Sequence, residues 1–417
     1  MEKYSSYKDS GVQWLGQVPS HWEMKRFRFL LTENAKQNTD LKERTQLQFR
    51  YGDIVQKTDQ SEDSEVLTTI QKYTVVAQGD IMINGLNLNY DFISQRVAQV
   101  QEPGVITSAY ICLRPIPGVN SRYYTYFMKA MDAKKMFHGM GSGVRLTLAY
   151  ANLKNLFFPY PTTEEQEAIV EFLDASTAKI DEAIEQQQRM VNLLNERKKI
   201  IINHAVTKGF RSNVKLVDTG IDWIGSIPDH WRLMQLRYTV TNHDNLRQPI
   251  TADQRERTNP QYDYYGASGV IDRIDHYNVD DKVLLIGEDG ANLVLRNLPL
   301  VYKAEGKFWV NNHAHILKPK DNDYEFMALV LEAADYTLFI TGSAQPKLSQ
   351  SNLNSVKLPI PPIEEQREIV KTIEPLLEKI NQSIAQQTRM IEYLEERKQI
   401  IINDVVTGKV KVISFFD

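Results

Sequence analysis

The chain has 417 residues, of which 24% are charged and 42% are hydrophobic, and its formal net charge is −4. These values are typical of a globular protein with two or three domains. They give no overall basic signature, so a nucleic-acid-binding surface would have to be local. No apolar run of about 18 residues predicts a transmembrane helix, and the N-terminus has no apolar core of a signal peptide. The lone Cys112 cannot form an intrachain disulfide, so we expect a reducing, cytoplasmic setting.

Each half of the chain begins with the same tryptophan-containing box. Residues 9–22 (DSGVQWLGQVPSHW) are matched by residues 218–231 (DTGIDWIGSIPDHW), 209 positions later. Because tryptophan side chains bury large apolar surfaces, we expect packing to be their role. The residues expected to anchor each box to the ends of helices are Trp14, Trp22, Trp223 and Trp231.

A stretch of domain size follows each box. Strand-forming runs and amphipathic patterns predict similar elements in both stretches. The predicted elements are strands over 73–84 and 105–113 and a helix over 121–137 in the first stretch, and strands over 282–286 and 308–317 and a helix over 324–340 in the second.

The middles of the two stretches differ. The segment Asn84–Arg96 has no evident counterpart in Gly287–Arg296. The chain therefore repeats one framework and varies the segment inside it. This arrangement suits a molecule that recognises two different targets at a fixed separation.

A long helical repeat closes each half. Residues 164–207 recur without a gap at residues 364–407, 200 positions later. A capping box at Thr163 and Gln166 would begin the first helix, glycines at 209 and 408 suit the two C-terminal ends, and Pro375 predicts a kink or break. Steps of three and four residues predict a coiled-coil seam, which in the first copy contains Ile169, Leu173, Ser176, Ile180, Ala183, Gln187, Met190, Leu194, Arg197 and Ile201, with Leu376, Met390 and Arg397 among its equivalents in the second.

Two similar helices in one chain most simply pack antiparallel about a pseudo-twofold axis, although the pattern does not exclude parallel packing. Polar residues also recur between the copies, and a merely solvated face would need polarity but not the same residues. We therefore favour a shared partner surface, or a mutual seam, over two ordinary surface helices. The recurring residues predicted to bind a partner are Gln187, Arg189, Glu196 and Arg197, with Gln387, Arg389, Glu396 and Arg397.

With these features the chain resembles the specificity (S) subunit of type I restriction-modification enzymes. The resemblance covers nearly the whole chain and rests on the helical repeats, the two boxes and short inner signatures. Those signatures are Gly79–Ile81, Tyr265–Gly269, Leu285–Ala291 and Asn311–His315.

The resemblance implies an α+β fold with two mixed α/β target-recognition domains (residues 1–160 and 209–361). Two spacer helices (161–208, and 362–417 with a C-terminal tail) would join them as an antiparallel coiled coil with pseudo-twofold symmetry. Each domain would read one half of a bipartite, asymmetric sequence in double-stranded DNA. The helices would dock two modification subunits that methylate adenine with S-adenosylmethionine, and restriction subunits using ATP and Mg²⁺ can join. This chain itself would carry no catalytic, cofactor or metal site.

Specific DNA binding needs amide or guanidinium groups for base edges and cations for phosphates. Arg145 and Lys347 lie in Gly-Ser loops that end the two domains. We interpret them as phosphate contacts, and an ordinary exposed charge is an equally good interpretation. The other predicted DNA-binding residues are Asn84, Asn87, Asn89 and Arg96 in the first middle, and Tyr265, Ser268, Asn292, Arg296 and Asn312 in the second half.

Weaker motifs keep two rival classes open. Residues 137–141 (FHGMG) and 259–262 (NPQY) approach adenine-methyltransferase motifs, but a cofactor loop should follow a strand and residue 137 ends a helical pattern. Asp289 with the segment 305–307 (EGK) has a loose nuclease pattern, and a pair at His313 and His315 lacks a third zinc ligand. A self-sufficient methyltransferase or nuclease, or a coiled-coil adaptor for other proteins, remains the alternative.

Overall fold

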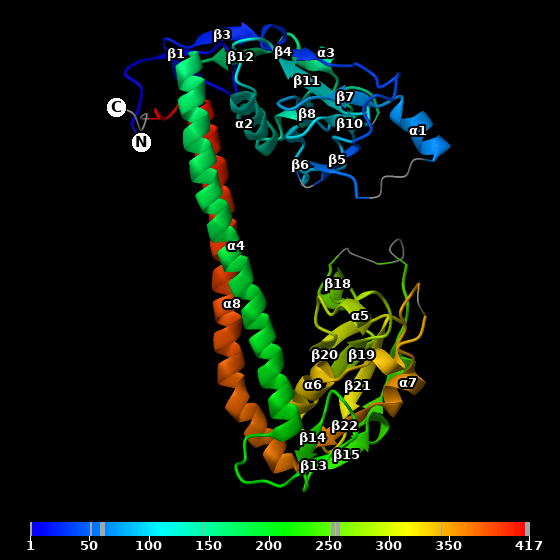
Figure 1. The fold of residues 1–417 in the computed structure, drawn as a ribbon. Coiled ribbons are helices and arrows are strands. Elements are labelled where there is room, and N and C mark those ends of the chain that lie inside the picture. The colour runs from blue at the N-terminus through cyan, green and yellow to red at the C-terminus, as the bar shows by residue number, and fades with distance from the viewer. Residues whose placement is uncertain are drawn as a thin grey trace. The chain divides into compact units, whose positions relative to one another are not determined.

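The computed structural model describes residues 2–50, 52–58, 63–144, 146–251, 255, 259–342 and 344–412. The chain divides into two compact units, unit 1 (Met1–Gln187 with Arg389–Asp417) and unit 2 (Gln188–Thr388). Each unit holds one globular domain and a pair of helical segments. The pairing arises because the long helices α4 (Thr163–Lys208) and α8 (Ile363–Val406) each contribute one half to either unit (Figure 1).

The globular part of unit 1 is built on a four-stranded antiparallel sheet of order β4-β11-β8-β9. Its strands are β4 (Leu31–Glu33), β11 (Ile111–Pro115), β8 (Ile81–Ile83) and β9 (Val97–Gln99). Two-stranded ribbons surround it: β1 (Tyr7–Asp9) with β2 (Gln17–Pro19), β3 (Glu23–Arg26) with β12 (Phe157–Tyr160), β5 (Leu47–Arg50) with β6 (Asp53–Gln56), and β7 (Thr74–Val76) with β10 (Gly104–Ile106). The helices are η1 (Phe27–Phe29), α1 (Ser64–Ile70), α2 (Ser121–Ala133), η2 (Met136–Gly139) and α3 (Tyr150–Leu153).

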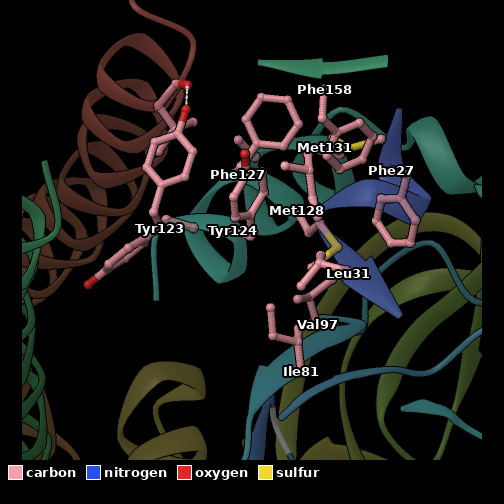
Figure 2. Packing of buried hydrophobic residues seen from close by; sticks show 14 of the residues in the cluster. Phe27, Leu31, Ile81, Val97, Tyr123, Tyr124, Phe127, Met128, Met131 and Phe158 are labelled. Atoms are coloured by element: carbon pink, nitrogen blue, oxygen red, sulfur yellow. Dashed lines mark hydrogen bonds between the residues drawn. The ribbon is translucent and has the colours of Figure 1, made fainter. Parts of the chain in front are cut away.

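Helix α2 supplies the centre of this core. The Asn120 side chain caps its N-terminus by accepting the Tyr123 amide at 3.1 Å. Phe127 then packs on Phe158 with ring centroids 4.9 Å apart, and each fully buried ring of this kind contributes roughly 1.5–3 kcal/mol. Figure 2 shows these rings above aliphatic side chains of the sheet. The Tyr123 hydroxyl donates to the Val406 carbonyl at 2.9 Å, so the same helix also holds the end of α8.

Unit 2 contains a six-stranded sheet of order β16-β21-β19-β20-β17-β18, antiparallel except where β17 runs parallel to β20. Residues 283–287 of the central strand are all buried, and residues 283–286 alternate between two apolar clusters on opposite faces. The strands are β16 (Val240–Asn242), β21 (Ala314–Pro319), β19 (Val279–Gly287), β20 (Val301–Val310), β17 (Tyr262–Gly266) and β18 (Gly269–Ile274), with the ribbons β13 (Leu216–Asp218)/β14 (Ser226–Pro228) and β15 (Arg232–Gln235)/β22 (Lys357–Ile360). The helices are η3 (Leu236–Tyr238), η4 (Asp244–Leu246), α5 (Asn292–Leu295), α6 (Tyr324–Ala333), η6 (Thr337–Phe339) and α7 (Gln350–Ser355).

The long helices pack antiparallel inside each unit, which confirms the simplest prediction. In unit 1 the Lys398 ammonium lies 2.7 Å from Asp181 Oδ1. In unit 2 the equivalent Lys198 donates to Asn381 Oδ1 at 2.8 Å. In each unit, therefore, a lysine near the end of one long helix contacts a polar residue nearer the start of the other.

The predicted seam is correct at its ends and wrong in its middle. Met190 and Met390 are 47% and 44% exposed, and Arg197 is also exposed, whereas Val191 and Lys198 are half-buried. After Gln187 the covered residues are Val191, Leu194 and Lys198, so a step of four comes where a step of three was predicted. In α8 the step after Ile373 is also four, so Leu377 is half-buried and Leu376 is 44% exposed.

Two further predictions need correction, and a third is confirmed. Pro375 does not break α8, because Pro375 and Lys371, whose carbonyl loses its amide donor, are both exposed to water. The capping box of α4 consists of Thr162 and Glu165, one residue earlier than predicted. Gly209 and Gly408 do end the two helices, with φ of +65° and +72°.

The run 308–317 was expected as one strand but forms two, β20 and β21. The Asn311 side chain accepts the amide of His313 at 2.8 Å and turns the chain between them. The predicted strand over 105–113 is likewise two strands, β10 and β11, and the predicted helices end as α-helix at Ala133 and Ala333. In the described part of the chain, no helix is both long and apolar enough to span a membrane.

Candidate nucleic-acid interface

The repeated sequence features fix each globular domain to the start of a long helix. Buried Gln166 accepts the Asn120 amide at 3.0 Å, and buried Gln366 accepts the Asp323 amide at 2.8 Å. Both amides lie at the N-terminus of the helix that covers the sheet, α2 or α6. Each glutamine therefore fixes the orientation of one globular domain relative to its long helix.

The histidine of each box reaches the same helix start. His21 Nε2 lies 2.9 Å from Glu165, and His230 Nε2 lies 2.7 Å from Glu365. Trp22 also donates to Glu165 at 3.2 Å. A Cβ added at Gly408 or Gly209 would lie 3.0 Å from the ring of the adjacent tryptophan, so both box tryptophans abut a helix end. The predicted anchoring role is confirmed for Trp22 and Trp231, while Trp14 and Trp223 pack, partly buried, against the two cores.

Four loops of unit 2 converge at one end of its sheet. The turn 266–269 meets β20 through the bond from the Asn311 amide to the Tyr265 carbonyl at 3.1 Å. The Glu288 amide donates to the His313 carbonyl at 2.8 Å, and the Leu348 amide donates to the Glu288 carbonyl at 2.7 Å. The structure thus brings together the predicted residues Tyr265, Ser268, Asn312 and Lys347.

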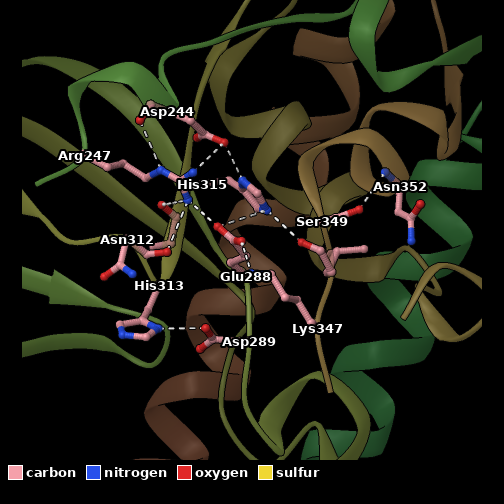
Figure 3. Close-up of polar contacts among 12 residues, drawn as sticks. Asp244, Arg247, Glu288, Asp289, Asn312, His313, His315, Lys347, Ser349 and Asn352 are labelled. Carbon is pink, nitrogen blue, oxygen red and sulfur yellow. Dashed lines mark hydrogen bonds and ion pairs between the residues drawn. The ribbon is translucent and has the colours of Figure 1, made fainter. Parts of the chain in front are cut away.

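A network of charged side chains connects these loops (Figure 3). Arg247 is hydrogen-bonded to Glu288 and lies 3.4 Å from Asp244, and Lys347 Nζ lies 3.1 Å from the second Glu288 oxygen. The fully buried His315 contacts Asp244 through Nδ1 at 2.6 Å and the Leu348 carbonyl through Nε2 at 2.8 Å. The network holds the loops in one arrangement.

Burial opposes ionisation of the two network carboxyls, but hydrogen bonds and nearby cations outweigh it. For Asp244 these are chiefly His315, and for Glu288 chiefly Arg247 and Lys347, so the pKa of each carboxyl lies below its usual range. Asp244 and Arg247 were missed by sequence reasoning. They lie far upstream of the loops that they hold, and no motif marks them.

In unit 1 the corresponding surface is made by residues 84–95 and the hairpin 141–148. The Leu148 amide donates to the Gly85 carbonyl at 2.9 Å, matching the bond between Leu348 and Glu288 in unit 2. Asn89 Nδ2 lies 3.4 Å from the Val144 carbonyl. Asn87 is exposed with φ of +52°, and Asn89 is half-buried.

Arg96 does not face solvent, so its predicted base contact is wrong for this structure. Its side chain is fully buried, and its guanidinium donates to the carbonyls of Asn84, Leu86 and Asp91 at 3.0, 2.8 and 2.6 Å. The arginine thus supplies donors to three carbonyls of the half-buried, curled loop. Arg96 shapes the loop instead of reading DNA.

Three other predicted readers are hydrogen-bonded to the backbone of their own domain. Asn84 Oδ1 accepts the Leu86 amide at 3.2 Å. Asn292 donates to the carbonyls of residues 298 and 299 and accepts the Leu298 amide at 2.8 Å. Arg296 donates to the carbonyls of residues 332 and 334 at 2.6 and 3.3 Å. Arg145 lies outside the described residues.

Within the described residues, neither the segment 137–141 nor the loose nuclease pattern has the arrangement that its chemistry needs. Phe137 is buried in η2, which follows α2 and not a strand. Asp289 pairs with His313 at 2.7 Å, and Glu305 pairs with Lys282 at 3.2 Å, so both carboxylates have partners other than each other. Among the described residues no group of three or more His, Cys, Asp or Glu side chains could hold a metal ion.

The long helices carry matching exposed stripes. Six apolar residues lie between 44% and 61% exposed, and every one of them has an exposed apolar equivalent 200 positions away: Met190, Leu193 and Ile200 on α4, and Met390, Tyr393 and Ile400 on α8. Of the predicted partner-binding residues, Gln187 and Gln387 are half-buried, and the exposed ones are Arg189, Glu196, Arg197, Arg389, Glu396 and Arg397.

The fold is that of a double-repeat molecule, with two recognition-type domains held on paired helices. Residues 49–190 and 240–393 match the model of the type I restriction modification DNA specificity domain. The chain belongs to this family, and a DNA-specificity subunit recognises sequence without being the catalytic subunit.

Relatives carry the same description. The chain is 22% identical over 391 residues to the MjaVIII specificity subunit of a type I restriction enzyme from Methanocaldococcus jannaschii, covering 84% of this chain and 83% of that protein. A Haemophilus influenzae protein named as a type I restriction enzyme specificity subunit, S.HindORF215P, is 32% identical over 147 residues, which is 35% of this chain and 37% of that protein. A chain in a solved type I R-M system structure superposes with a TM-score of 0.67 at 14% identity, covering 94% of this chain and 99% of that one, and so shares the fold.

Proposed function

We propose that this chain selects a bipartite, asymmetric sequence in double-stranded DNA, with unit 1 reading one half-site and unit 2 the other. The observation that carries the proposal is a shared framework with unlike reading surfaces. Gln166 and Gln366 orient the two domains in the same way. The loops they orient are held by a buried arginine in one unit and by a charged network in the other.

In unit 2 the reading surface is the set of converging loops. Asn312 and Ser268 are exposed there, and Lys347 is 54% exposed although it pairs with Glu288. An amide can bond two atoms of one adenine edge, and a lysine can neutralise a phosphate. We assign base contact to Asn312 and Ser268, and phosphate contact to Lys347. In unit 1 we retain Asn87 and Asn89 as readers.

The exposed stripes of the long helices are proposed to dock two modification subunits, one on each unit. Equivalent residues on α4 and α8 would then meet the same surface of two copies of one protein. The methyl donor, S-adenosylmethionine, would bind the modification subunits. Restriction subunits that use ATP and Mg²⁺ can join the complex. The lone Cys112 favours a cytoplasmic setting.

Long-read detection of N6-methyladenine tests the proposal. DNA would be compared from cells with the gene intact and deleted, both carrying the modification gene. A bipartite motif with two different halves is expected to vanish on deletion. An unchanged methylome would argue for an adaptor role, and a compact motif methylated by this chain alone would argue for a self-sufficient methyltransferase.

A further inference from the structure

Unit 1 contains a pocket of about 640 Å³ between its globular domain and its helix pair. Helix α2 forms one wall, α4 and α8 form another, and the loop residues 93–95 lie at its edge. Arg122 pairs with Asp174 at 2.9 Å and Lys398 pairs with Asp181. Lys129 is half-buried, has no hydrogen bond or ion pair within the described residues, and has its pKa lowered by burial.

Unit 2 contains a second pocket of about 520 Å³ at the corresponding place. It lies between the last turns of α4 and the C-terminal end of α6, and Arg296 borders it. The exposed residues Lys199 and Ile200 project from α4 at its rim, and Ile200 also belongs to the apolar stripe of that helix.

The two pockets share four lining positions. Ile402, Gln399, Ala133 and Asp132 line the first, and Ile202, Lys199, Ala333 and Glu332 line the second, each pair 200 residues apart. Asp132 and Glu332 also accept hydrogen bonds from comparable backbone amides. Asp132 accepts the Arg96 amide at 2.8 Å, beside the start of β9, and Glu332 accepts the Leu300 and Val301 amides at 2.9 Å, at the start of β20.

An exposed apolar side chain lines each pocket, and others lie close by in the chain. Ile93, which is 94% exposed, lines the first pocket, and Tyr90 on the same loop is 76% exposed. Ile200, which is 61% exposed, lines the second pocket. Val294 and Leu295 of α5, each 60% exposed, directly precede its lining residue Arg296. Exposed apolar side chains that cluster in this way are typical of an interaction surface.

We propose that each pocket receives the same polypeptide segment from one of two modification subunits, so that partner docking extends from the helix stripes onto both recognition domains. This rests on the proposed function, because it takes the modification subunit as the partner. A repeated pocket in an otherwise varied domain fits a partner that is present in two identical copies. DNA half-sites read by unlike loops would have no reason to share it.

The charges on the pocket wall suit a polypeptide. The first pocket is lined by three carboxylates and four cations: Asp53, Asp132 and Asp181, with Arg122, Lys129, Lys135 and Lys398. A polypeptide carries donors, acceptors and both signs of charge, so it can pair with both sets. A phosphate oxygen only accepts and could pair with the cations alone.

Site-directed cross-linking tests the proposal in the assembled complex. Gln399→Cys and Lys199→Cys, one at a time, would be labelled with benzophenone maleimide in the full chain, co-expressed with the modification subunit and supplied with a duplex containing the methylated motif. Cys112 is buried and contributes no background. The matched controls are Ala151→Cys and Ser351→Cys, exposed and equivalent positions on α3 and α7 that line neither pocket.

Both pocket positions are expected to cross-link to the same peptide of the modification subunit, and the controls are not. A second pair of variants measures binding: Ala133→Trp and Ala333→Trp should each weaken one of the two docking events about tenfold or more by filling a pocket. The pocket positions could instead cross-link to DNA, or to neither partner, in a complex that still methylates its motif. That result would overturn the pocket inference and leave the proposed function standing. A chain that never assembles with a modification subunit would overturn the proposed function as well.

Discussion

Asp244 Oδ2 lies 2.6 Å from Nδ1 of His315, and the other oxygen of the same carboxylate accepts the Ile316 amide at 2.8 Å. One carboxylate from η4 therefore fixes both the side chain and the backbone of the strand β21. His315 in turn reaches the Leu348 carbonyl in the loop that carries Lys347. The position of a proposed phosphate contact is thus set by a residue about 100 positions upstream.

Asp244→Asn should destabilise unit 2 by about 3 kcal/mol at neutral pH, because it removes a buried carboxylate that contacts Arg247, His315 and the Ile316 amide. The folded pKa of Asp244 lies below the unfolded value of about 3.9. The stabilisation is therefore complete above that value and is lost as the pH falls through the folded pKa. Urea unfolding between pH 7 and pH 3 should show a shallower acid loss for the variant. An identical pH profile would contradict the assignment.

Arg96→Lys should lower stability by roughly 2–3 kcal/mol, because an ammonium cannot reach three carbonyls as a planar guanidinium does. Differential scanning calorimetry measures this change. Asn87→Gly is the matched variant, since glycine keeps the positive φ while removing the amide. It should leave stability within about 0.5 kcal/mol but cost roughly 1–3 kcal/mol of discrimination at one base position. If Arg96→Lys changed base discrimination and Asn87→Gly lowered stability, the assigned roles of the two residues would be reversed.

Lys347→Ala should weaken binding of the assembled complex to all DNA sequences. The slope of log affinity against log salt concentration should fall by about one unit, because one phosphate contact is lost. Fluorescence anisotropy over a salt series measures this. Lys320→Ala, at an exposed lysine outside the converging loops, should leave the slope unchanged. Asn312→Ala should change discrimination and not the slope.

The seam register predicts different outcomes for neighbouring residues of α4. Val191→Asp places a charge in the half-buried contact between helices and should cost about 2 kcal/mol in stability. Met190→Asp lies on the exposed stripe and should cost less than about 0.5 kcal/mol. Thermal unfolding separates the two. If the stripe docks a partner, Met190→Asp should also weaken binding of the modification subunit, as measured by co-purification.

Cys112 should be chemically inert in the folded chain. Burial, and then the charge of Asp80, raise the pKa of its thiol to about 12, so almost no thiolate exists at pH 8. Ellman's reagent should release no chromophore from the folded protein and one equivalent after unfolding in urea. Rapid reaction of the folded protein would show that the surrounding core opens.

Much of the framework could be predicted because it is local or repeated. The ungapped repeat at residues 164–207 and 364–407 predicted two long helices, and their similarity predicted antiparallel packing. The seam was wrong at Met190 and Arg197, since steps of three and four fit the pattern equally well there. Only the second helix decided which of Met190 and Val191 is covered.

The site was predicted less well than the fold. Residue type pointed equally to Arg96 and Lys347, yet one is fully buried and the other is largely exposed. The N–H groups of a guanidinium can donate either to a base edge or to backbone carbonyls. The residue type alone therefore does not predict which of the two an arginine binds. The loop geometry of residues 84–91 made that choice.

The sequence by itself determined the double-repeat architecture, the boxes that anchor each domain and the family of the chain, because periodicity and capping act within a few residues. The tertiary structure decided which polar side chains remain available to DNA. It also decided that Asp244 and Arg247 hold the loops of unit 2, and that two equivalent pockets form beside the helices. Those outcomes depend on contacts between residues tens to hundreds of positions apart, where burial and hydrogen-bond satisfaction take precedence over residue type.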